Sequence, residues 1–210
     1  MILAQANTDP HAAAGLLVVL LSATFTDNIL LARFLGMCPF LSVSRELKAA
    51  FGMGLAVLLV TTCTCAINAA LYWGVLQPLE AYHVPAESLK LILFILVIAA
   101  FVQLMEMVIE RISLKLYFSL GVFLPLITVN CAILGTSLFM VNKELRGLEA
   151  VGYGFGSGLG WMIAILLMAG IRQKLKKARI PPALEGPGIT LIIAGIMAMA
   201  FVVFSGMIKI

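Results

Sequence analysis

The chain has 210 residues, of which 62% are hydrophobic and only 11% are charged. A soluble domain has about 45–50% apolar and about 25% charged residues, so this composition excludes an ordinary soluble protein and indicates an integral membrane protein. The formal net charge of +4 does not indicate a nucleic-acid partner. Helices and closed barrels are the structures that satisfy their backbone within lipid, and the alternating pattern of a barrel is missing. We therefore expect an all-α integral membrane protein.

Six apolar segments of the sequence are long enough to cross a bilayer, which takes about 20 residues. They cover residues 12–43, 50–76, 89–108, 116–141, 150–171 and 188–208. The connectors between them are short and carry most of the charged residues. We therefore predict one membrane domain over residues 1–210, without a soluble domain. Chemistry that needs a nucleotide-binding domain is expected in other subunits.

The Lys and Arg residues predict how the chain is oriented, because these residues concentrate in cytoplasmic connectors. The connectors after the first, third and fifth spans contain Arg45, Lys48, Arg111, Lys115, Arg172, Lys174, Lys176, Lys177 and Arg179. The opposite side contains Lys90, Lys143, Arg146 and Lys209. The first 32 residues lack Lys and Arg, so a secretory signal is not expected. We predict a multi-pass protein of a bacterial inner membrane with both termini in the periplasm.

Two of the six spans are predicted to be broken helices. As one helix, the 32 residues of the first span would be about 48 Å long, against about 30 Å of hydrocarbon. Residues that interrupt helices occur in the first span at Thr26, Asp27, Asn28, Gly36 and Pro39, and in the fourth at Gly121, Pro125, Asn130 and Gly135. Irregular backbone at membrane depth is tolerated only where it is buried in protein or lines a cavity.

A weak internal repeat relates the two halves of the chain. Residues 51–55 (FGMGL) resemble residues 155–159 (FGSGL), and AFV at 100–102 recurs at 200–202. Three spans in each half place the second copy upside down, so we predict inverted repeats over about 12–108 and 116–208. Inverted repeats with paired broken helices place a functional site near the bilayer midplane, where the repeats meet.

Each broken span contains one cysteine, Cys38 in FLGMCPF and Cys131 in FLPLITVNCAILG. A thiolate in hydrocarbon is costly unless something positive binds it, and for paired cysteines the usual group is a metal or an iron–sulfur cluster. Such a cluster normally takes four thiolates. Either these cysteines are small packing residues, or another chain supplies two more ligands.

Other polar residues of the spans have two interpretations each. Glu106 is either an intramembrane functional carboxylate or an interfacial residue at the end of the third span. Asp27 and Asn28 either bind a hard cation through oxygen or cap a half-helix, and capping is favoured. Cys63 and Cys65 point to different helix faces, which favours packing over metal binding.

The sequence resembles the NqrDE/RnfAE family of membrane subunits from about residue 20 to the end. The segments that carry the resemblance are FLGMCPFLSVSRELK, VQLMEMVIER, GVFLPLITVNCAILG, YGFGSGLGWM and GITLIIAGIMAMAF. The resemblance implies six spans in an inverted repeat and a homologous subunit of opposite topology (NqrD-like) within a six-subunit complex. It also implies that Cys38 and Cys131 bind half of one [2Fe–2S] cluster shared with that subunit. Glu106 matches the family's membrane carboxylate linked to sodium uptake.

The function that the resemblance implies is electron transfer in a Na+-translocating NADH:quinone reductase. The NADH site and the flavins lie in other subunits, so this chain contains no complete active site. The GFGSGLGWM and PPALEGPGIT segments favour this complex over an RnfA-type subunit of a ferredoxin:NAD+ oxidoreductase. A different class remains open: a stand-alone secondary ion transporter in which Asp27 and Glu106 bind the ion and the cysteines only pack.

Overall fold

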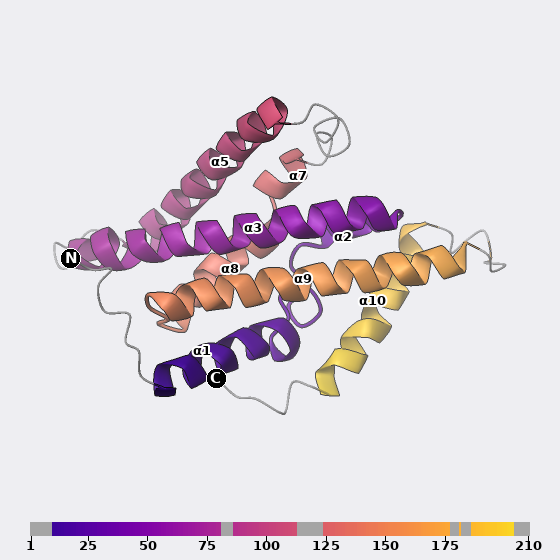
Figure 1. Cartoon of the computed structure of the whole chain (residues 1–210), viewed down its shortest axis with the longest axis horizontal. Helices are drawn as coiled ribbons and strands as arrows, with labels where there is room; N and C mark the ends of the chain where they lie inside the picture. Colours follow the sequence, from indigo (N-terminus) through magenta and orange to yellow (C-terminus); the bar gives the residue numbers. More distant parts are fainter. Residues whose placement is uncertain (1–9, 81–85, 113–123, 177–180, 182–185, 204–210) are drawn as a thin grey trace.

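The computed structural model describes residues 10–80, 86–112, 124–176, 181 and 186–203, and every regular element in them is helical (Figure 1). This confirms the all-α prediction. In chain order the elements are α1 (Pro10–Leu21), η1 (Ser22–Thr26), α2 (Met37–Val43), α3 (Leu47–Leu71), η2 (Tyr72–Leu76), α4 (Gln77–Glu80), α5 (Ala86–Ile112), α7 (Leu124–Thr128), α8 (Cys131–Asn142), α9 (Leu148–Leu175) and α10 (Pro187–Val202).

Among the described residues, three segments are long and apolar enough to cross a membrane: Leu47–Leu76, Leu89–Val108 and Leu148–Leu175. They correspond to the second, third and fifth predicted spans. Large apolar side chains on the outer faces of α5 and α10 are widely exposed, Leu96 by 66% and Met199 by 74%. Such surfaces suit lipid or a partner helix, as expected of a membrane protein. The count of six stays a prediction, because residues 116–123 and 204–208 lie outside the described residues.

Helices α3 and α9 form the centre of the molecule and lie side by side (Figure 1). Two glycines allow the helices to approach closely. A Cβ on Gly54 would meet the side chain of Met162, and a Cβ on Gly158 would meet Leu58. A shift of 104 residues converts the first contact into the second. Such reciprocal contacts are typical of a twofold relation, and they support the predicted inverted repeat for this pair of helices.

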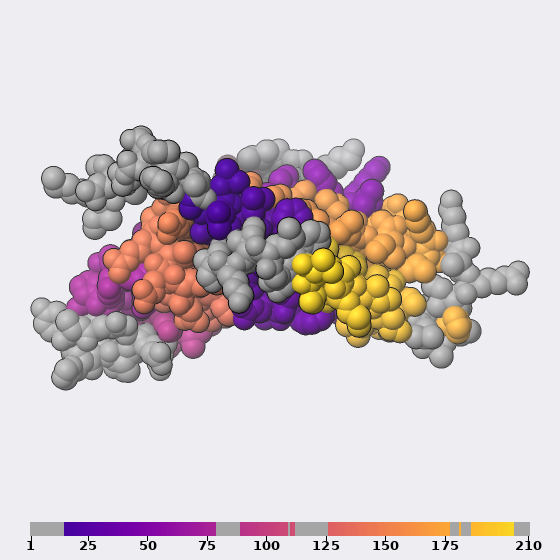
Figure 2. Space-filling model, turned by 90° about the horizontal axis from the view of Figure 1, so that it is seen from below, coloured from indigo at the N-terminus to yellow at the C-terminus, as the bar shows by residue number. Residues whose placement is uncertain are grey.

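The first span lies along α9 and runs in the same direction. Going up the chain, glycines of α9 pack against successive residues of α1 and η1: Gly152 against Leu16, Gly156 against Leu20 and Gly160 against Thr24. In Figure 2 the surface of this first segment (indigo) lies between the surfaces of second-half residues (salmon and yellow). The halves of the chain are therefore interleaved. The single membrane domain and its repeat boundaries stay a prediction.

Helix α8 runs in the same direction as α3, as two pairs of contacts show. Asn68 donates to the Ser137 hydroxyl, and further along both segments the indole N–H of Trp73 donates to the Leu145 carbonyl. Because α3 is antiparallel to α9, these directions are the ones that the six-span topology requires. The first and fifth spans share one direction, and the second and fourth share the other.

Both predicted breaks are present in the structure. The first span leaves its helix after Thr26 and re-enters one at Met37, and the fourth span is interrupted between Thr128 and Cys131. Gly135 does not break the chain as expected. It lies inside α8, where its missing side chain makes room for Leu35.

The two prolines in these spans fit the first turns of short helices, where a missing N–H costs nothing. Pro39 is in α2 and Pro125 is in α7. Gly121 lies outside the described residues.

Candidate functional site

Cys38 and Cys131 occupy matching positions just after the two breaks. Cys38 is the second residue of α2, and Cys131 is the first residue of α8. Neither forms a disulfide, and both are exposed on the surface of the chain. Because both thiols are exposed, they are accessible to a group that this chain shares with another polypeptide.

Gly36 connects the two breaks directly. Its backbone N–H donates a hydrogen bond to Cys131 Sγ at 3.0 Å, across 95 residues of sequence. Its carbonyl oxygen accepts from Trp161 Nε1 at 3.4 Å. A Cβ at this position would lie 2.5 Å from that nitrogen and 2.9 Å from Ala132 Cβ. Only glycine fits, because its φ of +80° and the close approach both exclude a side chain.

The contact between Gly36 and Trp161 also indicates how deep the site lies in the membrane. Trp161 is fully buried and lies in the middle of α9, a helix long enough to span a membrane. The first break therefore lies level with the middle of a spanning helix. This is where the inverted-repeat argument expects a functional site.

Asn130 fixes the start of α8. Its side-chain oxygen accepts from the Ala132 N–H at 3.0 Å, which is an N-cap interaction. The cap makes Cys131 the first helical residue.

The segment of residues 27–36, here called the break segment, runs antiparallel along one face of α8. From its start to its end, the contacts are Asp27 with Lys143, Arg33 with Phe139, Leu35 with Gly135 and Gly36 with Cys131. The partners on α8 and at its C-cap, Lys143, recur every four residues, which places them on one helix face. Sequence reasoning did not find this packing, because a non-helical segment has no periodicity that could predict its neighbours.

Asp27 forms ion pairs with two cations of this segment and of α8. Its carboxylate oxygens lie 3.1 Å from Arg33 Nε and 3.0 Å from Lys143 Nζ. The six-residue spacing of Asp27 and Arg33 did not predict a pair, since it does not match a helix face. The neighbouring Asn28 accepts from the N–H groups of Leu30 and Leu31. These bonds form a turn and not the helix cap that was favoured, because the next helix begins only at Met37.

Arg172 holds the other end of the helix that begins beside Cys38. Its guanidinium Nη1 donates to the Leu41 carbonyl at 3.0 Å and to the Ser44 hydroxyl at 2.8 Å. Sequence analysis counted Arg172 only as an orientation signal. A conformational role of this kind could not be found from the sequence, because the two contacts lie 131 and 128 residues away along the chain.

The remaining candidate residues lie apart from the cysteines. Glu106 is half-buried near the end of α5, and no contact among the described residues links it to Cys38 or Cys131. Cys65 is fully buried, and its thiol donates to the Ala150 carbonyl at 3.3 Å. This confirms the packing interpretation for Cys65. Cys63 is partly exposed.

The cysteines are not part of a complete metal site among the described residues. Within the part of the chain that the structure describes, no three His, Cys, Asp or Glu side chains are grouped to bind a metal. That Cys38 and Cys131 supply two ligands to a group shared with another chain stays a prediction.

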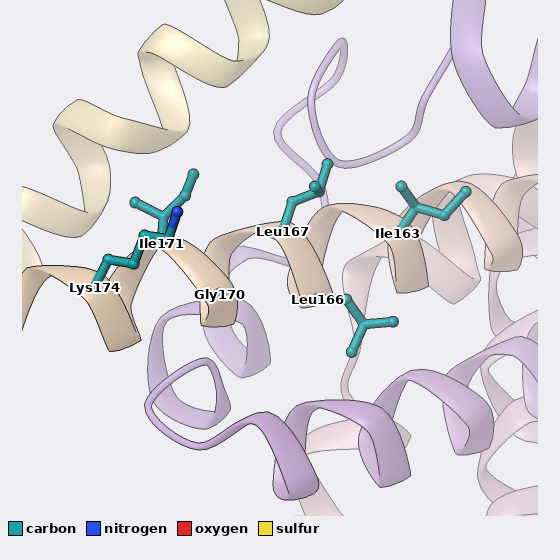
Figure 3. A pocket seen from close by; sticks show the side chains of 6 residues that line it. All are labelled: Ile163, Leu166, Leu167, Gly170, Ile171 and Lys174. Atoms are coloured by element: carbon teal, nitrogen blue, oxygen red, sulfur yellow. The ribbon is translucent and has the colours of Figure 1, made fainter.

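An open groove lies elsewhere, along the outer face of α9, with a volume of about 480 Å³ (Figure 3). Five of its six lining residues are apolar or glycine and the sixth is Lys174. Neither cysteine lines it, so it is separate from the candidate site.

Comparison with known proteins agrees with the resemblance drawn from the motifs. Residues 16–208 match the family described as "Rnf-Nqr subunit, membrane protein". The E subunit of the Na(+)-translocating NADH-quinone reductase of Hahella chejuensis is 48% identical over 195 residues, which cover 90% of this chain and 96% of the relative. The E subunit of the same enzyme from Marinobacter nauticus is 50% identical with the same coverage. The chain therefore belongs to the Rnf-Nqr family of membrane subunits.

Proposed function

We propose that this chain is the E subunit of a Na+-translocating NADH:quinone reductase and binds half of an intramembrane [2Fe–2S] cluster. The first part is supported by two relatives of that name, which are about half identical over nearly their whole length. The second part depends on Cys38 and Cys131, which supply two of the four thiolates that such a cluster takes.

The observation that carries the cluster assignment is the hydrogen bond from the Gly36 N–H to Cys131 Sγ. Backbone N–H donors to sulfur are one of the means by which proteins stabilise and tune iron–sulfur clusters. The bond counts together with exposure, because the packing cysteine Cys65 also has a backbone N–H beside its sulfur, that of Gly154, but is fully buried and donates to the Ala150 carbonyl, whereas Cys38 and Cys131 are both exposed. When bound, a [2Fe–2S] cluster supplies one-electron transfer.

The residues of this chain hold and prepare the half-site. The two breaks place Cys38 and Cys131 on helix starts that face outward. Large apolar side chains beside them are also exposed, Phe34 by 52% and Val129 by 79%. An apolar surface around two open thiols suits a homologous subunit of inverted topology (NqrD-like), which supplies the other two ligands.

The remaining parts of the reaction belong to other subunits of a six-subunit complex in the bacterial inner membrane. Those subunits bind NADH, the flavins and the quinone, and the complex couples electron transfer with sodium export. Glu106 is the better candidate for the ion path in this chain. Asp27 is the second candidate, but both of its oxygens already pair with cations.

The competing functions have less support. The names of the relatives favour the quinone reductase over an RnfA-type subunit of a ferredoxin:NAD+ oxidoreductase. A stand-alone transporter with packing cysteines leaves the Gly36 N–H···Sγ bond and the exposure of both thiols without a purpose.

The proposal is tested by Cys38→Ser and Cys131→Ser in the intact complex. We expect each variant to lose one [2Fe–2S] signal in electron paramagnetic resonance, two iron atoms per complex, and quinone reduction by NADH. Cys63→Ser is the matched control, because Cys63 is also partly exposed but lies in the middle of α3. Full iron content and normal quinone reduction in both test variants would reject the assignment.

A further inference from the structure

We propose that Asp27 is a positioning residue for the cysteine site. Through its ion pairs it fixes the break segment along α8, and it thereby sets the hydrogen bond that the Gly36 N–H donates to Cys131 Sγ. This inference rests on the proposed function, since its effect is measured on the cluster that Cys131 binds.

The charges around Asp27 form a closed group at the far end of α8 from Cys131. The side chain of Asp27 is only 16% exposed, and that of Lys143 is 24% exposed. Aromatic rings hold the two cations in place, with Arg33 Cζ 4.7 Å from the centre of the Phe139 ring and Lys143 Nζ 5.3 Å from that of Tyr153. An unpaired charge is expensive in this environment, so loss of the Asp27 charge forces Lys143 to move, while the side chain of Arg33 is 45% exposed and less constrained.

A displacement at Asp27 is carried to Gly36 because the break segment is bonded within itself. Asn28 accepts from the N–H groups of Leu30 and Leu31, and its own carbonyl accepts from the Ala32 N–H. The Phe34 N–H donates to the Leu30 carbonyl, and the Leu35 N–H donates to the Ile29 carbonyl. The segment is thus one compact unit.

The unit is fastened to α8 by a few contacts. One end is held by the ion pair of Asp27 with Lys143, and the other end by the bond of Gly36 with Cys131. Between them Leu35 fits the space left by Gly135. If the ion pair of Asp27 with Lys143 is lost, we expect the geometry of the hydrogen bond between Gly36 and Cys131 to change.

The sign of the change in reduction potential separates positioning from a simple charge effect. Hydrogen bonds to cluster sulfurs raise the potential, because they stabilise the more negative reduced state. Loss of the Gly36 bond therefore lowers it. Removal of the Asp27 charge without any movement would raise the potential, because a negative charge disappears near the site.

The experiment is a redox titration of the cluster in the intact complex, followed by electron paramagnetic resonance. For Asp27→Asn we expect the reduction equilibrium to shift about tenfold toward the oxidised state, about 59 mV for one electron, with altered g-values. We expect the double variant Asp27→Asn/Lys143→Gln, which removes the ion pair and keeps the net charge, to shift it in the same direction. Asp27→Glu restores the carboxylate and should recover most of the wild-type value. Glu144→Gln is the matched control, since it removes an exposed charge next to Lys143, and should leave the potential unchanged.

A potential that rises in Asp27→Asn, or that equals the value of Glu144→Gln, would overturn the inference. If Asp27→Asn does not assemble, the double variant Asp27→Asn/Lys143→Gln carries the test, because it removes the ion pair without changing the net charge, so a lowered potential still reports movement of the break segment. Failure of the proposed function is seen separately, since the cluster would then survive Cys38→Ser and Cys131→Ser.

Discussion

Both backbone polar groups of Gly36, the N–H and the carbonyl, form a hydrogen bond to a distant part of the chain, and the conformation of Gly36 allows both bonds. Its N–H reaches Cys131 Sγ, its carbonyl reaches Trp161, and its φ of +80° belongs to the left-handed region. Phe34, two residues earlier, also has a positive φ of 55°. A non-glycine residue in this region is uncommon, and such strain is concentrated at functional sites. The chain thus reverses tightly where it meets the cysteine.

We expect Gly36→Ala to destabilise the complex by about 2–5 kcal/mol. The left-handed conformation costs an L-residue about 1–2 kcal/mol, and overpacking against Trp161 and Ala132 adds about 1–3 kcal/mol. Thermal unfolding of the purified complex measures the loss, and iron content reports whether the half-site still forms. Gly195→Ala is the control, since a Cβ there meets nothing within 4 Å. Equal stability of the two variants would contradict this account of Gly36.

The sequence predicted the residues of the site better than their partners. Gly36 and Asn130 were identified as break residues because both types end or begin helices with clear physical causes. The partners of Asp27 were not predictable. Lys143 is 116 residues away in the chain, and Arg33 is paired through a fold of the backbone that no helical spacing describes.

At the scale of helices, two of the glycines at the crossing of α3 and α9 are related by the shift of 104 residues but differ in their opposing atoms. A Cβ on Gly158 would lie 2.9 Å from Leu58 Cα, which is backbone. A Cβ on Gly54 would lie 2.7 Å from Met162 Cγ, and this flexible side chain can change its rotamer. The repeat thus gives similar helices with different tolerance at equivalent positions.

We expect Gly158→Ala to destabilise the complex by about 1–3 kcal/mol, because the helices must move apart. Gly54→Ala should cost less than about 1 kcal/mol, since Met162 can adapt and alanine favours the helix. Each variant is the control for the other in thermal unfolding. A larger loss for Gly54→Ala would show that the close backbone contact at Gly158 does not limit the crossing.

Arg172 gives a second prediction for an element, the short helix α2. Its guanidinium satisfies the Leu41 carbonyl, one of the last carbonyls of the helix, which otherwise lack a partner. We expect Arg172→Gln to destabilise the complex by about 1 kcal/mol, a charge-assisted bond reduced by partial exposure. Lys174→Gln, two residues along the same helix, should have no comparable effect. Equal thermal stability of the two variants would show that α2 does not need this bond.

The elements themselves were predictable in proportion to their apolar length. The second, third and fifth spans were identified within a few residues because a bilayer requires about 20 apolar residues in a helix. The break segment was predicted only as a break. Its packing along α8 depends on Gly135. Glycine often breaks helices, but here its missing side chain leaves space for Leu35. Composition cannot distinguish these two uses of glycine.

For the molecule as a whole, the relative directions of three pairs of spans are consistent with one another. The first span is parallel to α9, α3 is antiparallel to α9, and α8 is parallel to α3. These relations fix the spans relative to one another but not relative to the membrane. The distribution of Lys and Arg supplies that orientation, since these residues concentrate after the first, third and fifth spans.

We therefore expect the C-terminus to lie in the periplasm. Alkaline phosphatase fused after Ile210 should be active, because the enzyme folds only outside the cytoplasm. The same enzyme fused after Lys176, in the connector that follows the fifth span, should be inactive, and a green fluorescent protein at this position should fluoresce. Activity after Lys176 and none after Ile210 would reverse the orientation. Equal activity at both positions would mean that the sixth span does not cross the membrane, and it would remove the inverted repeat from which the midplane position of the cysteines was argued.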